Sequence, residues 1–316
     1  MLRRMLGPMG ALACALFIAA PAAAQQGTVT LVTNFVAGGP SDLMSRLMAP
    51  ELSAALGVPV VVKNSVGAAG TIGAAEVARA RPDGTTLLLS PIGAMAVQPH
   101  FRADLPYRPA DFAPVCQVAD TPVVIMAAPE GPVRTVADIL SRARETRGAF
   151  NFASTGPGSL PHISTVALAR AAGVEMTHVP FRGNAEAVTA LLRGDVGMFA
   201  DQPGTIRANN LRPVAVFARE RSAEFPGTPT LRELGHDLSY SIWSGIWAPA
   251  GTPEPLLQRL EAACERALRH PAVIEGFQRL ATPIVHRDRA AFAAFWQAEL
   301  EKFRGIVQAA GIRPGD

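Results

Sequence analysis

Short apolar runs rich in Val and Thr alternate with helical segments along the chain, and this alternation most constrains its fold. Residues 29–33 predict a strand, residues 41–56 a helix that ends at Gly57, and residues 58–62 the next strand. Repetition of this pattern predicts an α/β protein with mostly parallel sheets built from βαβ units. Pro50 interrupts the first long helix. Because proline inside a helix costs about 3 kcal/mol, we expect a kink there or two successive helices.

The same alternation continues towards the C-terminus. We expect further strands over 86–89, 123–127, 151–154, 175–179 and 197–200, an extended segment over 239–247, and helices over 71–80, 135–146, 161–172, 185–192, 255–268 and 289–307. The chain has 316 residues, of which 49% are hydrophobic and 17% charged, and this balance excludes a disordered protein. A chain of this length usually divides into two domains.

The first 24 residues have the three parts of a secretory signal peptide. Two arginines precede the apolar stretch 11–20, which is much shorter than the roughly 18 residues that a membrane span needs. Ala22 and Ala24 supply the small residues of a cleavage site. We therefore expect cleavage after Ala24 and a soluble protein in the periplasm. A retained membrane anchor and a lipid-modified Cys14 are the alternatives.

The charge balance argues against a nucleic-acid partner. The chain has 29 Lys and Arg against 26 Asp and Glu, a formal charge of +3, and loss of the leader's two arginines would reduce it to +1. Binding of nucleic acid depends largely on attraction between basic side chains and phosphates. We therefore expect no nucleic-acid partner.

Two cysteines, Cys116 and Cys264, remain after cleavage of the leader and could pair in an oxidising compartment. Cys264, however, continues an apolar helical stripe with Leu257, Leu260 and Leu268. We expect two buried thiols, with a disulfide as the alternative.

Two glycine-containing loops, each between a predicted strand and a predicted helix, form the candidate ligand site. The first covers residues 35–42 and the second residues 154–161. Glycine allows the backbone to approach a ligand closely, and the N-terminus of the following helix offers unpaired N–H groups with partial positive charge. Hydroxyl groups in the second loop add donors. Either loop alone could be only a tight turn, but together they predict an anion site.

The segments around these loops resemble the Bug family of solute-binding proteins, the extracytoplasmic receptors of tripartite tricarboxylate transporters. In chain order the resembling motifs are Gly38-Gly39-Pro40-Ser41-Asp42, residues 62–73, Pro82-Asp83-Gly84, residues 154–159 with His162, residues 179–183, Gly194-Asp195 with Asp201, and residues 248–253. These motifs cover nearly the whole mature chain. Asn34 stands where the family commonly has Pro, and Ser41 where it commonly has Thr.

The resemblance implies a type II periplasmic-binding-protein fold, in which two α/β lobes close on a ligand cleft. It implies a first lobe of residues 25–124 plus 245–316 and a second lobe of residues 125–244, with crossings near 123–127 and 239–247. It also implies capture of a small organic acid for the integral membrane subunits of a transporter. We expect the protein to be a monomer.

The candidate ligand-binding residues come from both glycine loops and from two later segments. They are Phe35, Ala37, Gly38, Gly39, Ser41, Asp42, Ser154, Thr155, Gly156, Gly158, Ser159, His162, Arg182 and Asp201. We expect backbone N–H and hydroxyl groups to hold a carboxylate without an arginine clamp. Arg182 either lies near the cleft or is a solvated charge. His162 either touches ligand or packs on its loop, and Asp201 either faces the ligand or caps the next turn.

The identity of the carboxylate stays open at this point. Val36, Ala37, Ile92 and Met95 would give the pocket wall an apolar character, which suits a monocarboxylate or an aromatic acid as well as a dicarboxylate.

A periplasmic sensor that presents its ligand to a membrane kinase and an enzyme are the competing function classes. The sequence has no Gly-x-Ser-x-Gly elbow, no His-Glu-x-x-His and no phosphate loop, and its histidines lack metal-ligand spacing. We therefore expect no catalysis, no metal and no cofactor. A hydrolase built on Ser154, His162 and Asp201 is the least favoured alternative.

Overall fold

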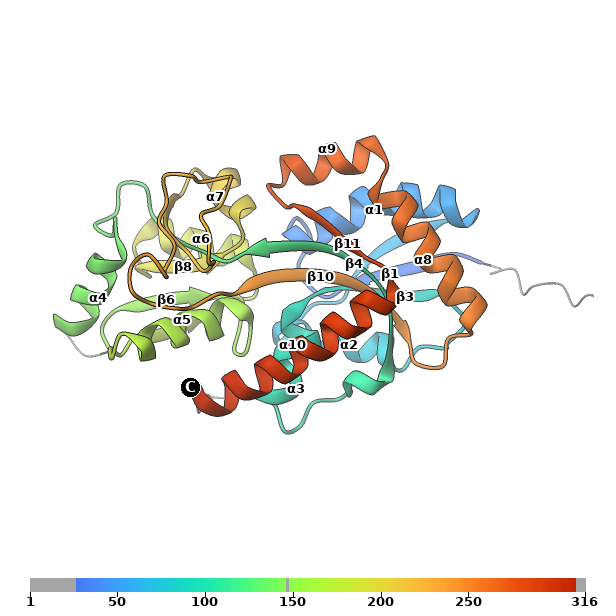
Figure 1. Cartoon of the computed structure of the whole chain (residues 1–316), viewed down its shortest axis with the longest axis horizontal. Helices are drawn as coiled ribbons and strands as arrows, with labels where there is room; N and C mark the ends of the chain where they lie inside the picture. Colours follow the sequence, from blue (N-terminus) through green and yellow to red (C-terminus); the bar gives the residue numbers. More distant parts are fainter. Residues whose placement is uncertain (1–26, 146–147, 311–316) are drawn as a thin grey trace, which may run out of the picture.

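The structure is a computed structural model that describes residues 27–145 and 148–310. The predicted signal peptide, its cleavage site and Cys14 lie outside the described residues. The chain folds into two α/β lobes that lie side by side in Figure 1, each built on its own sheet. The predicted α/β class with two lobes is therefore confirmed.

The first lobe is built on a sheet whose strands lie in the order β11-β4-β10-β3-β1-β2. The strands are β1 (Val29–Thr33), β2 (Val60–Asn64), β3 (Thr86–Pro91), β4 (Phe112–Pro122), β10 (Ser241–Pro249) and β11 (Ile284–Arg287). β1 pairs parallel with β2 and β3, whereas β10 pairs antiparallel with β3 and β4, and β11 antiparallel with β4.

The second lobe is built on a sheet with the order β7-β6-β8-β5-β9. Its strands are β5 (Val124–Ala127), β6 (Asn151–Ser154), β7 (Thr177–Pro180), β8 (Met198–Asp201) and β9 (Arg212–Val216). β6 pairs parallel with β7 and β8, and β5 pairs antiparallel with β8 and β9.

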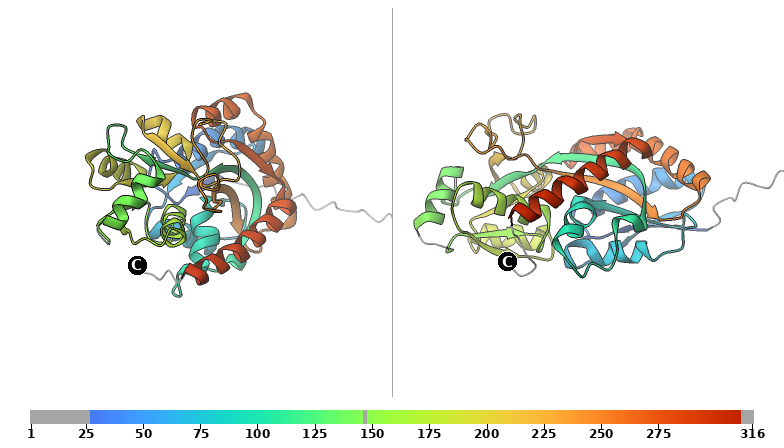
Figure 2. Two further views of the ribbon diagram at one scale, coloured as in Figure 1. Left: turned by 60° about the vertical axis from the view of Figure 1, so that its left-hand side comes forward. Right: turned by 60° about the horizontal axis from the view of Figure 1, so that its bottom comes forward.

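Helices cover the faces of both sheets. The α-helices of the first lobe are α1 (Pro40–Leu56), α2 (Thr71–Ala78), α3 (Gln98–Phe101), α8 (Glu254–Leu268), α9 (Pro271–Arg279) and α10 (Arg289–Ala310). The α-helices of the second lobe are α4 (Val136–Glu145), α5 (Leu160–Ala171), α6 (Asn184–Arg193) and α7 (Pro203–Asn209). α10 packs on β4 and α3 and reaches α5 of the second lobe, as Figure 2 shows.

The chain crosses between the lobes at two neighbouring points. β4 ends at Pro122 in the first sheet and β5 begins at Val124 in the second, while the return segment enters β10 at Ser241. Val123 N–H donates to the Tyr240 carbonyl (3.0 Å), Tyr240 N–H to that of Phe217 (2.9 Å), and Phe217 N–H to that of Val123 (2.8 Å). These bonds hold the two crossing segments together. The lobe boundaries at 124/125 and 244/245 stay a prediction.

The core beside the crossings is aromatic. Trp243 and Trp247 of β10 are fully buried and pack against Phe292 of α10, with ring centroids 6.0 Å and 5.1 Å away. Trp296 packs on Trp247 and donates its indole N–H to the Met95 carbonyl at 2.8 Å. The C-terminal helix is thereby fixed to the first lobe.

Two expectations about structure are wrong, and a third is excluded in one of its two forms. The sheets are mixed rather than mostly parallel, because the returning strand β10 inserts between β3 and β4 instead of completing a βαβ unit. α1 runs from Pro40 to Leu56 as one helix, which excludes two successive helices, while the kink expected as the other possibility at Pro50 stays a prediction. Pro50 lies on the exposed side of α1. Water can therefore donate a hydrogen bond to the backbone carbonyl that the proline leaves without an N–H partner. The end of α1 is as expected, since Gly57 adopts a left-handed φ of 67°.

The third correction concerns the cysteines, because Cys116 and Cys264 form a disulfide instead of two buried thiols. The helical stripe on α8 is present, with Leu257 and Leu260 buried beside Cys264. This face of α8 packs on β4, and Cys116 is the β4 residue beneath Cys264. A sequence separation of 148 residues hides this contact from any local pattern.

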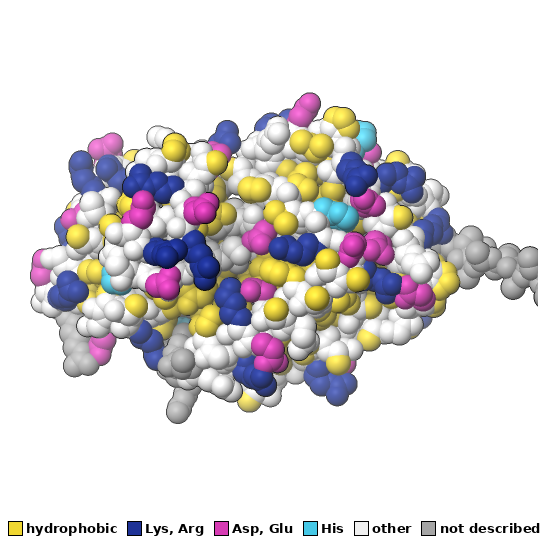
Figure 3. Space-filling view, in the orientation of Figure 1, with side chains coloured by type: hydrophobic (Ala, Val, Ile, Leu, Met, Phe, Trp, Pro, Cys, Tyr) yellow, Lys and Arg dark blue, Asp and Glu magenta, His cyan; other side chains and the backbone are white. Residues whose placement is uncertain are grey.

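The surface carries charges of both signs. On the face shown in Figure 3, Lys and Arg side chains lie among Asp and Glu side chains over both lobes. Within the ranges 27–145 and 148–310, none of the helices combines the length and the apolar character that a bilayer crossing requires.

Candidate functional site

Two adjacent hollows lie between the lobes. The inner cavity has a volume of about 50 Å³, and seven of its lining residues are polar: Ser41, Thr155, Ser159, Asn184, Asp201, Gln202 and Ser244. The outer groove has a volume of about 650 Å³ and is lined by residues 66–70, residues 155–157, and residues of the segment from Pro180 to Glu186. Phe35 and Thr155 line both hollows, which therefore meet at these two residues.

A third hollow of about 590 Å³ lies at residues 127–133 and 191–197, in the second lobe alone. It brings together no residues from the glycine loops. The interlobe hollows are the better candidate site, since ligand pockets commonly lie between domains and combine apolar walls with a few convergent polar groups.

Three helices begin at the inner cavity. α1 contributes Pro40 and Ser41, α5 contributes Leu160 and Pro161, and α6 contributes Asn184. The first N–H groups of a helix have no intrahelical partner and carry partial positive charge. These helices follow β1, β6 and β7, each a member of a parallel pair, so their N-termini gather at the carboxyl ends of the strands. No Lys or Arg lines the inner cavity among the described residues. The site is therefore suited to hold an anion by backbone and hydroxyl groups.

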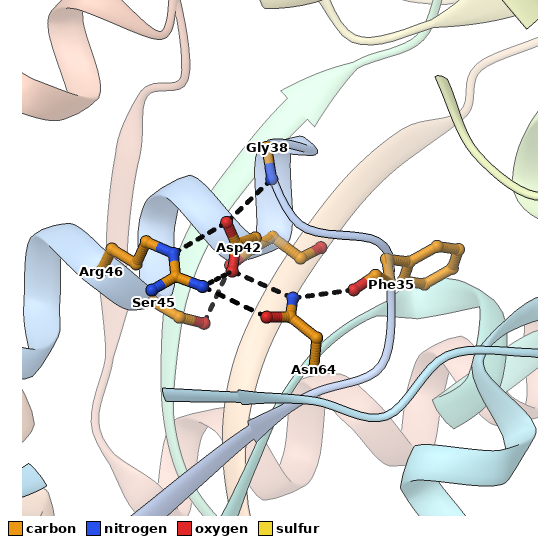
Figure 4. A network of polar contacts seen from close by, with 7 residues as sticks. Phe35, Gly38, Asp42, Ser45, Arg46 and Asn64 are labelled. Carbon is orange, nitrogen blue, oxygen red and sulfur yellow. Dashed lines mark hydrogen bonds and ion pairs between the residues drawn. The ribbon is translucent and has the colours of Figure 1, made fainter. Parts of the chain in front are cut away.

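The first glycine loop is braced by the carboxylate of Asp42, as Figure 4 shows. The Gly38 N–H and the Arg46 Nε–H donate to Oδ2, each at 2.9 Å, and Asn64 Nδ2 donates to Oδ1 at 2.9 Å. Asn64 also donates to the Phe35 carbonyl at 3.0 Å. Burial raises the pKa of the Asp42 carboxyl, but hydrogen bonds from Arg46, Gly38 and Asn64 together hold it below its ordinary value. The carboxylate and the Gly38 N–H are thus engaged in shaping the loop.

The second glycine loop is braced by side chains beneath it. The Gly156 N–H donates to Ser154 Oγ at 3.0 Å, and the Gly158 N–H donates to His162 Nδ1 at 3.1 Å. The His162 N–H donates to Ser159 Oγ, the N-cap of α5, at 3.4 Å. Gly158 has a φ of +71°, and a Cβ there would lie 2.5 Å from Gln98 Nε2 of the first lobe. Glycine is needed at this position both for the backbone conformation and for the close approach of the lobes.

His162 is buried in a stack of rings under the second loop. Its ring lies 4.0 Å from that of His178, and Phe152 stacks on both. Burial and the neighbouring His178 lower the pKa of His162 to about 3, so its ring is neutral near pH 7. Because Nδ1 accepts the Gly158 N–H, the ring proton is on Nε2. His162 therefore packs against its own loop and supports the Gly158 backbone.

Asp201 ends β8 at the inner cavity and is 4% exposed. Its Oδ2 accepts hydrogen bonds from Thr205 Oγ1 at 2.8 Å and from Asn184 Nδ2. Burial raises the pKa of Asp201 to about 7, and the hydrogen bonds from Thr205, the Gln202 backbone and Asn184 offset only part of that rise. Asp201 therefore lines the cavity and is bonded to Thr205 of α7, and its contact with a ligand stays a prediction.

The structure brings half of the predicted site residues to the two hollows. Phe35, Ser41, Thr155, Ser159 and Asp201 line the inner cavity, and Gly156 and Arg182 line the outer groove. The others, which lie in or under the loops without lining either hollow, are Ala37, Gly38, Gly39, Asp42, Ser154, Gly158 and His162. Arg182 is exposed.

Sequence reasoning missed several lining residues. Residues 67–70 line the outer groove, and Ala68 and Ala69 there adopt left-handed φ angles of 47° and 53°. This segment lies inside a motif that resembles the Bug family, so a signal for it existed. Asn184 directly follows another such motif. Ser244 lies in the middle of β10, where no local pattern distinguishes it.

The hydrolase alternative does not match the contacts. Ser154 Oγ lies 2.6 Å from Nε2 of His178, not of His162, and also donates to the Gly156 carbonyl at 3.1 Å. Asp201 is bonded to Thr205 and Asn184, not to a histidine. In the part of the chain that the structure describes, no three His, Cys, Asp or Glu side chains gather in a way that could hold a metal ion.

Comparisons with known proteins agree on one family. Residues 44–312 match the family model described as "Tripartite tricarboxylate transporter family receptor". The structure of the periplasmic binding protein BugD is similar, with 30% identity and a TM-score of 0.84 over 91% of this chain and 99% of that one. MatC from Rhodopseudomonas palustris with bound malate has 33% identity and a TM-score of 0.84 over 89% and 99%. Rpa4515 of R. palustris with adipate has 29% identity and a TM-score of 0.85 over 92% and 99%.

Proposed function

Because the chain belongs to the tripartite tricarboxylate transporter receptor family, we propose that it captures a small organic carboxylate in the periplasm and delivers it to the membrane subunits of a transporter. The observation that carries this proposal is the convergence of three helix N-termini on an interlobe cavity that no Lys or Arg lines in the described chain. Such a site favours an anion without a fixed cationic partner.

The ligand class follows from the donors and from the related proteins. Charge-assisted hydrogen bonds contribute about 1.5–3 kcal/mol each, so three or four reach the roughly 8 kcal/mol of micromolar binding after ordering costs. MatC is described with malate and Rpa4515 with adipate, which are dicarboxylates of different length. We propose a mono- or dicarboxylate in this size range, with one carboxylate at the helix N-termini and the remainder against Phe35, Met44 and Ile92.

Binding would involve separation and closure of the lobes. The inner cavity of about 50 Å³ is far below the several hundred Å³ of usual ligand sites. The lobes also touch directly, since Gln98 Nε2 of the first donates to the Pro157 carbonyl of the second at 2.9 Å. We propose that ligand enters when the lobes are apart and is enclosed when they close about the crossings at Val123 and Tyr240.

The proposed compartment and partners follow from the leader and the family. We propose that the leader is cleaved after Ala24, that the mature protein is a periplasmic monomer, and that it contacts integral membrane transporter subunits. Intact-mass measurement of the exported protein tests the first point, and a mass that retains residues 1–24 would contradict it.

We also propose that the protein catalyses no reaction. Turnover of a generic ester that is lost in Ser154→Ala would contradict that.

A thermal-shift screen tests the binding function itself. The panel is succinate, malate, adipate, benzoate and citrate, with glucose and ethanolamine as non-acidic controls. A ligand that binds only the folded state at 100 times its Kd adds about 2.7 kcal/mol of stability, which gives a clear rise in Tm. We expect at least one acid to produce this rise. A rise with glucose or ethanolamine alone would contradict the carboxylate assignment.

Variants locate the binding to the inner cavity. Ser41→Ala and Ser159→Ala each remove a hydroxyl from its wall, and each should raise the Kd of the acid by about fivefold, or about 1 kcal/mol. Ser141→Ala, on the exposed surface of α4, is the matched control and should bind as the wild type does. Equal effects of all three substitutions would place the site elsewhere.

A further inference from the structure

Asp201 is the one residue with an acidic or basic side chain among the described residues that line the inner cavity. The three helix N-termini make the cavity favourable for an anion, whereas an ionised Asp201 makes it unfavourable for one. Two carboxylates in a site that excludes water repel each other strongly, and such pairs usually share a proton. A carboxylate ligand and Asp201 cannot both be charged there without loss of affinity.

The hydrogen bonds from Thr205 and Asn184 favour ionised Asp201, but they do not prevent protonation of its other oxygen. The donors of Thr205 and Asn184 both reach the same oxygen, Oδ2. In a protonated carboxyl one oxygen is a carbonyl that accepts two bonds, and the other is a hydroxyl that donates one. With Oδ2 as the carbonyl, the hydroxyl on Oδ1 can donate to a group in the cavity. Buried carboxylic acids that stay neutral and donate a hydrogen bond are known from enzyme active sites.

We propose that Asp201 makes carboxylate capture proton-coupled: it takes one proton from solvent as the ligand binds and donates that proton in a hydrogen bond to a ligand carboxylate. This inference rests on the proposed function, because it concerns a carboxylate in the same cavity. No covalent bond of the ligand changes, and the proton returns to solvent on release. Asp201 thereby selects ligands that accept a hydrogen bond at the inner end of the cleft over ligands that present only a donor there.

The surroundings of Asp201 are consistent with a proton taken up near neutral pH. Burial raises the pKa of its carboxyl to about 7, and its partners Thr205, Asn184 and the Gln202 backbone are hydrogen-bond donors rather than a cation. β5 beside it is apolar and β6 carries no ionisable side chain. The ionisable groups on the other elements around it are engaged elsewhere: Asp42 with Arg46, His162 with His178 and Gly158, Glu186 with the Arg182 backbone, and Arg207 with Glu224.

Calorimetric titration with malate, adipate and succinate at pH 6.0 and pH 8.5 tests the proposal. These acids are largely ionised at both values, so their own titration contributes little. If the ligand binds only the neutral form of a group whose pKa is about 7, Kd rises about thirtyfold between the two values. At pH 8.5, titration in two buffers of different ionisation enthalpy should show uptake of nearly one proton per ligand.

The isosteric variant Asp201→Asn keeps a carbonyl for Thr205 and Asn184 and an N–H for the ligand. Its Kd should change by less than about threefold between pH 6.0 and pH 8.5, and proton uptake should vanish. Asp195→Asn, an exposed acid of the same lobe, is the matched control and should behave as the wild type. Circular dichroism and thermal unfolding show whether each variant is folded.

Three results would overturn the inference. A wild-type Kd that is constant with pH, without proton uptake, would show that Asp201 takes no part as an acid. A Kd that falls as pH rises would show that ionised Asp201 binds a donor on the ligand. Binding of none of the acids in the panel at either pH would defeat the proposed function and this inference with it. If Asp201→Asn does not fold, proton uptake by the wild type alone decides the question.

Discussion

Gly183 and Val36 meet where the two lobes touch, and replacement of Gly183 by alanine tests whether this contact belongs to the ligand-holding state. Gly183 precedes α6 in the second lobe, and Val36 lies in the first glycine loop. A Cβ on Gly183 would lie 2.6 Å from Val36 Cγ2. The φ of Gly183 is −175°, which any residue adopts, so alanine adds this overlap without backbone strain.

The size of the effect follows from the overlap. Carbon atoms in contact prefer about 3.5–4.0 Å, so roughly 1 Å must be relieved by the stiff valine side chain or by separation of the lobes. Overpacking of this kind costs about 1–3 kcal/mol, and it applies only when the lobes are closed. The Kd for the carboxylate should therefore rise by about five- to 150-fold. The free energy of unfolding without ligand should fall by less, because open lobes avoid the overlap.

The assay is calorimetric titration of Gly183→Ala, Val36→Ala and the double variant with the acid that gives the largest thermal shift. Val36→Ala removes Cγ2, so the double variant should bind within about threefold of Val36→Ala alone. Wild-type affinity in Gly183→Ala, or a double variant as weak as Gly183→Ala, would refute the reasoning. In either case the lobe contact seen here would not be part of the ligand-bound state.

Three further predictions concern the loop brace, the exposed arginine and the disulfide. Asp42→Ala should lower the free energy of unfolding by about 2–4 kcal/mol at pH 7, because it removes three hydrogen bonds to a buried carboxylate. Since folding lowers the pKa of Asp42, its contribution is fully present above about pH 4, and urea unfolding of wild type and variant should converge as the pH falls through this lowered pKa. Arg182→Ala should raise Kd by less than about fivefold, with an effect that shrinks as salt rises in the titration. Paired Cys116→Ala and Cys264→Ala should cost about 2–5 kcal/mol of stability in urea unfolding, with no further loss on adding a reductant.

Elements with a strong local pattern could be predicted from the sequence. β1 and β6 have the expected bounds, and α1 ends at Gly57 as predicted, because strand alternation and a glycine C-cap depend on neighbouring residues alone. β2 begins at Val60 rather than at residue 58, which is a local error of boundary. The sequence pattern does not predict the strands β4, β9 and β11, because each of them depends on the strand with which it pairs.

The candidate site shows the same division. Both glycine loops could be located in advance, and residues of both line the interlobe hollows. The bond between Asp42 and Asn64 could not be foreseen, because Asn64 lies 22 residues away at the end of another strand. The same holds for His162, whose ring stacks on His178 of β7.

The sequence by itself determined the α/β class, the two glycine loops and the helices that begin behind them, because propensity, periodicity and caps act within a few residues. Only the tertiary structure decided that β10 lies between β3 and β4, that α8 brings Cys264 onto Cys116, and that Asp201 stands as the sole acid in the inner cavity of the described chain. Each of these depends on which distant segments pack together, and that choice is made by burial of whole faces rather than by any local pattern.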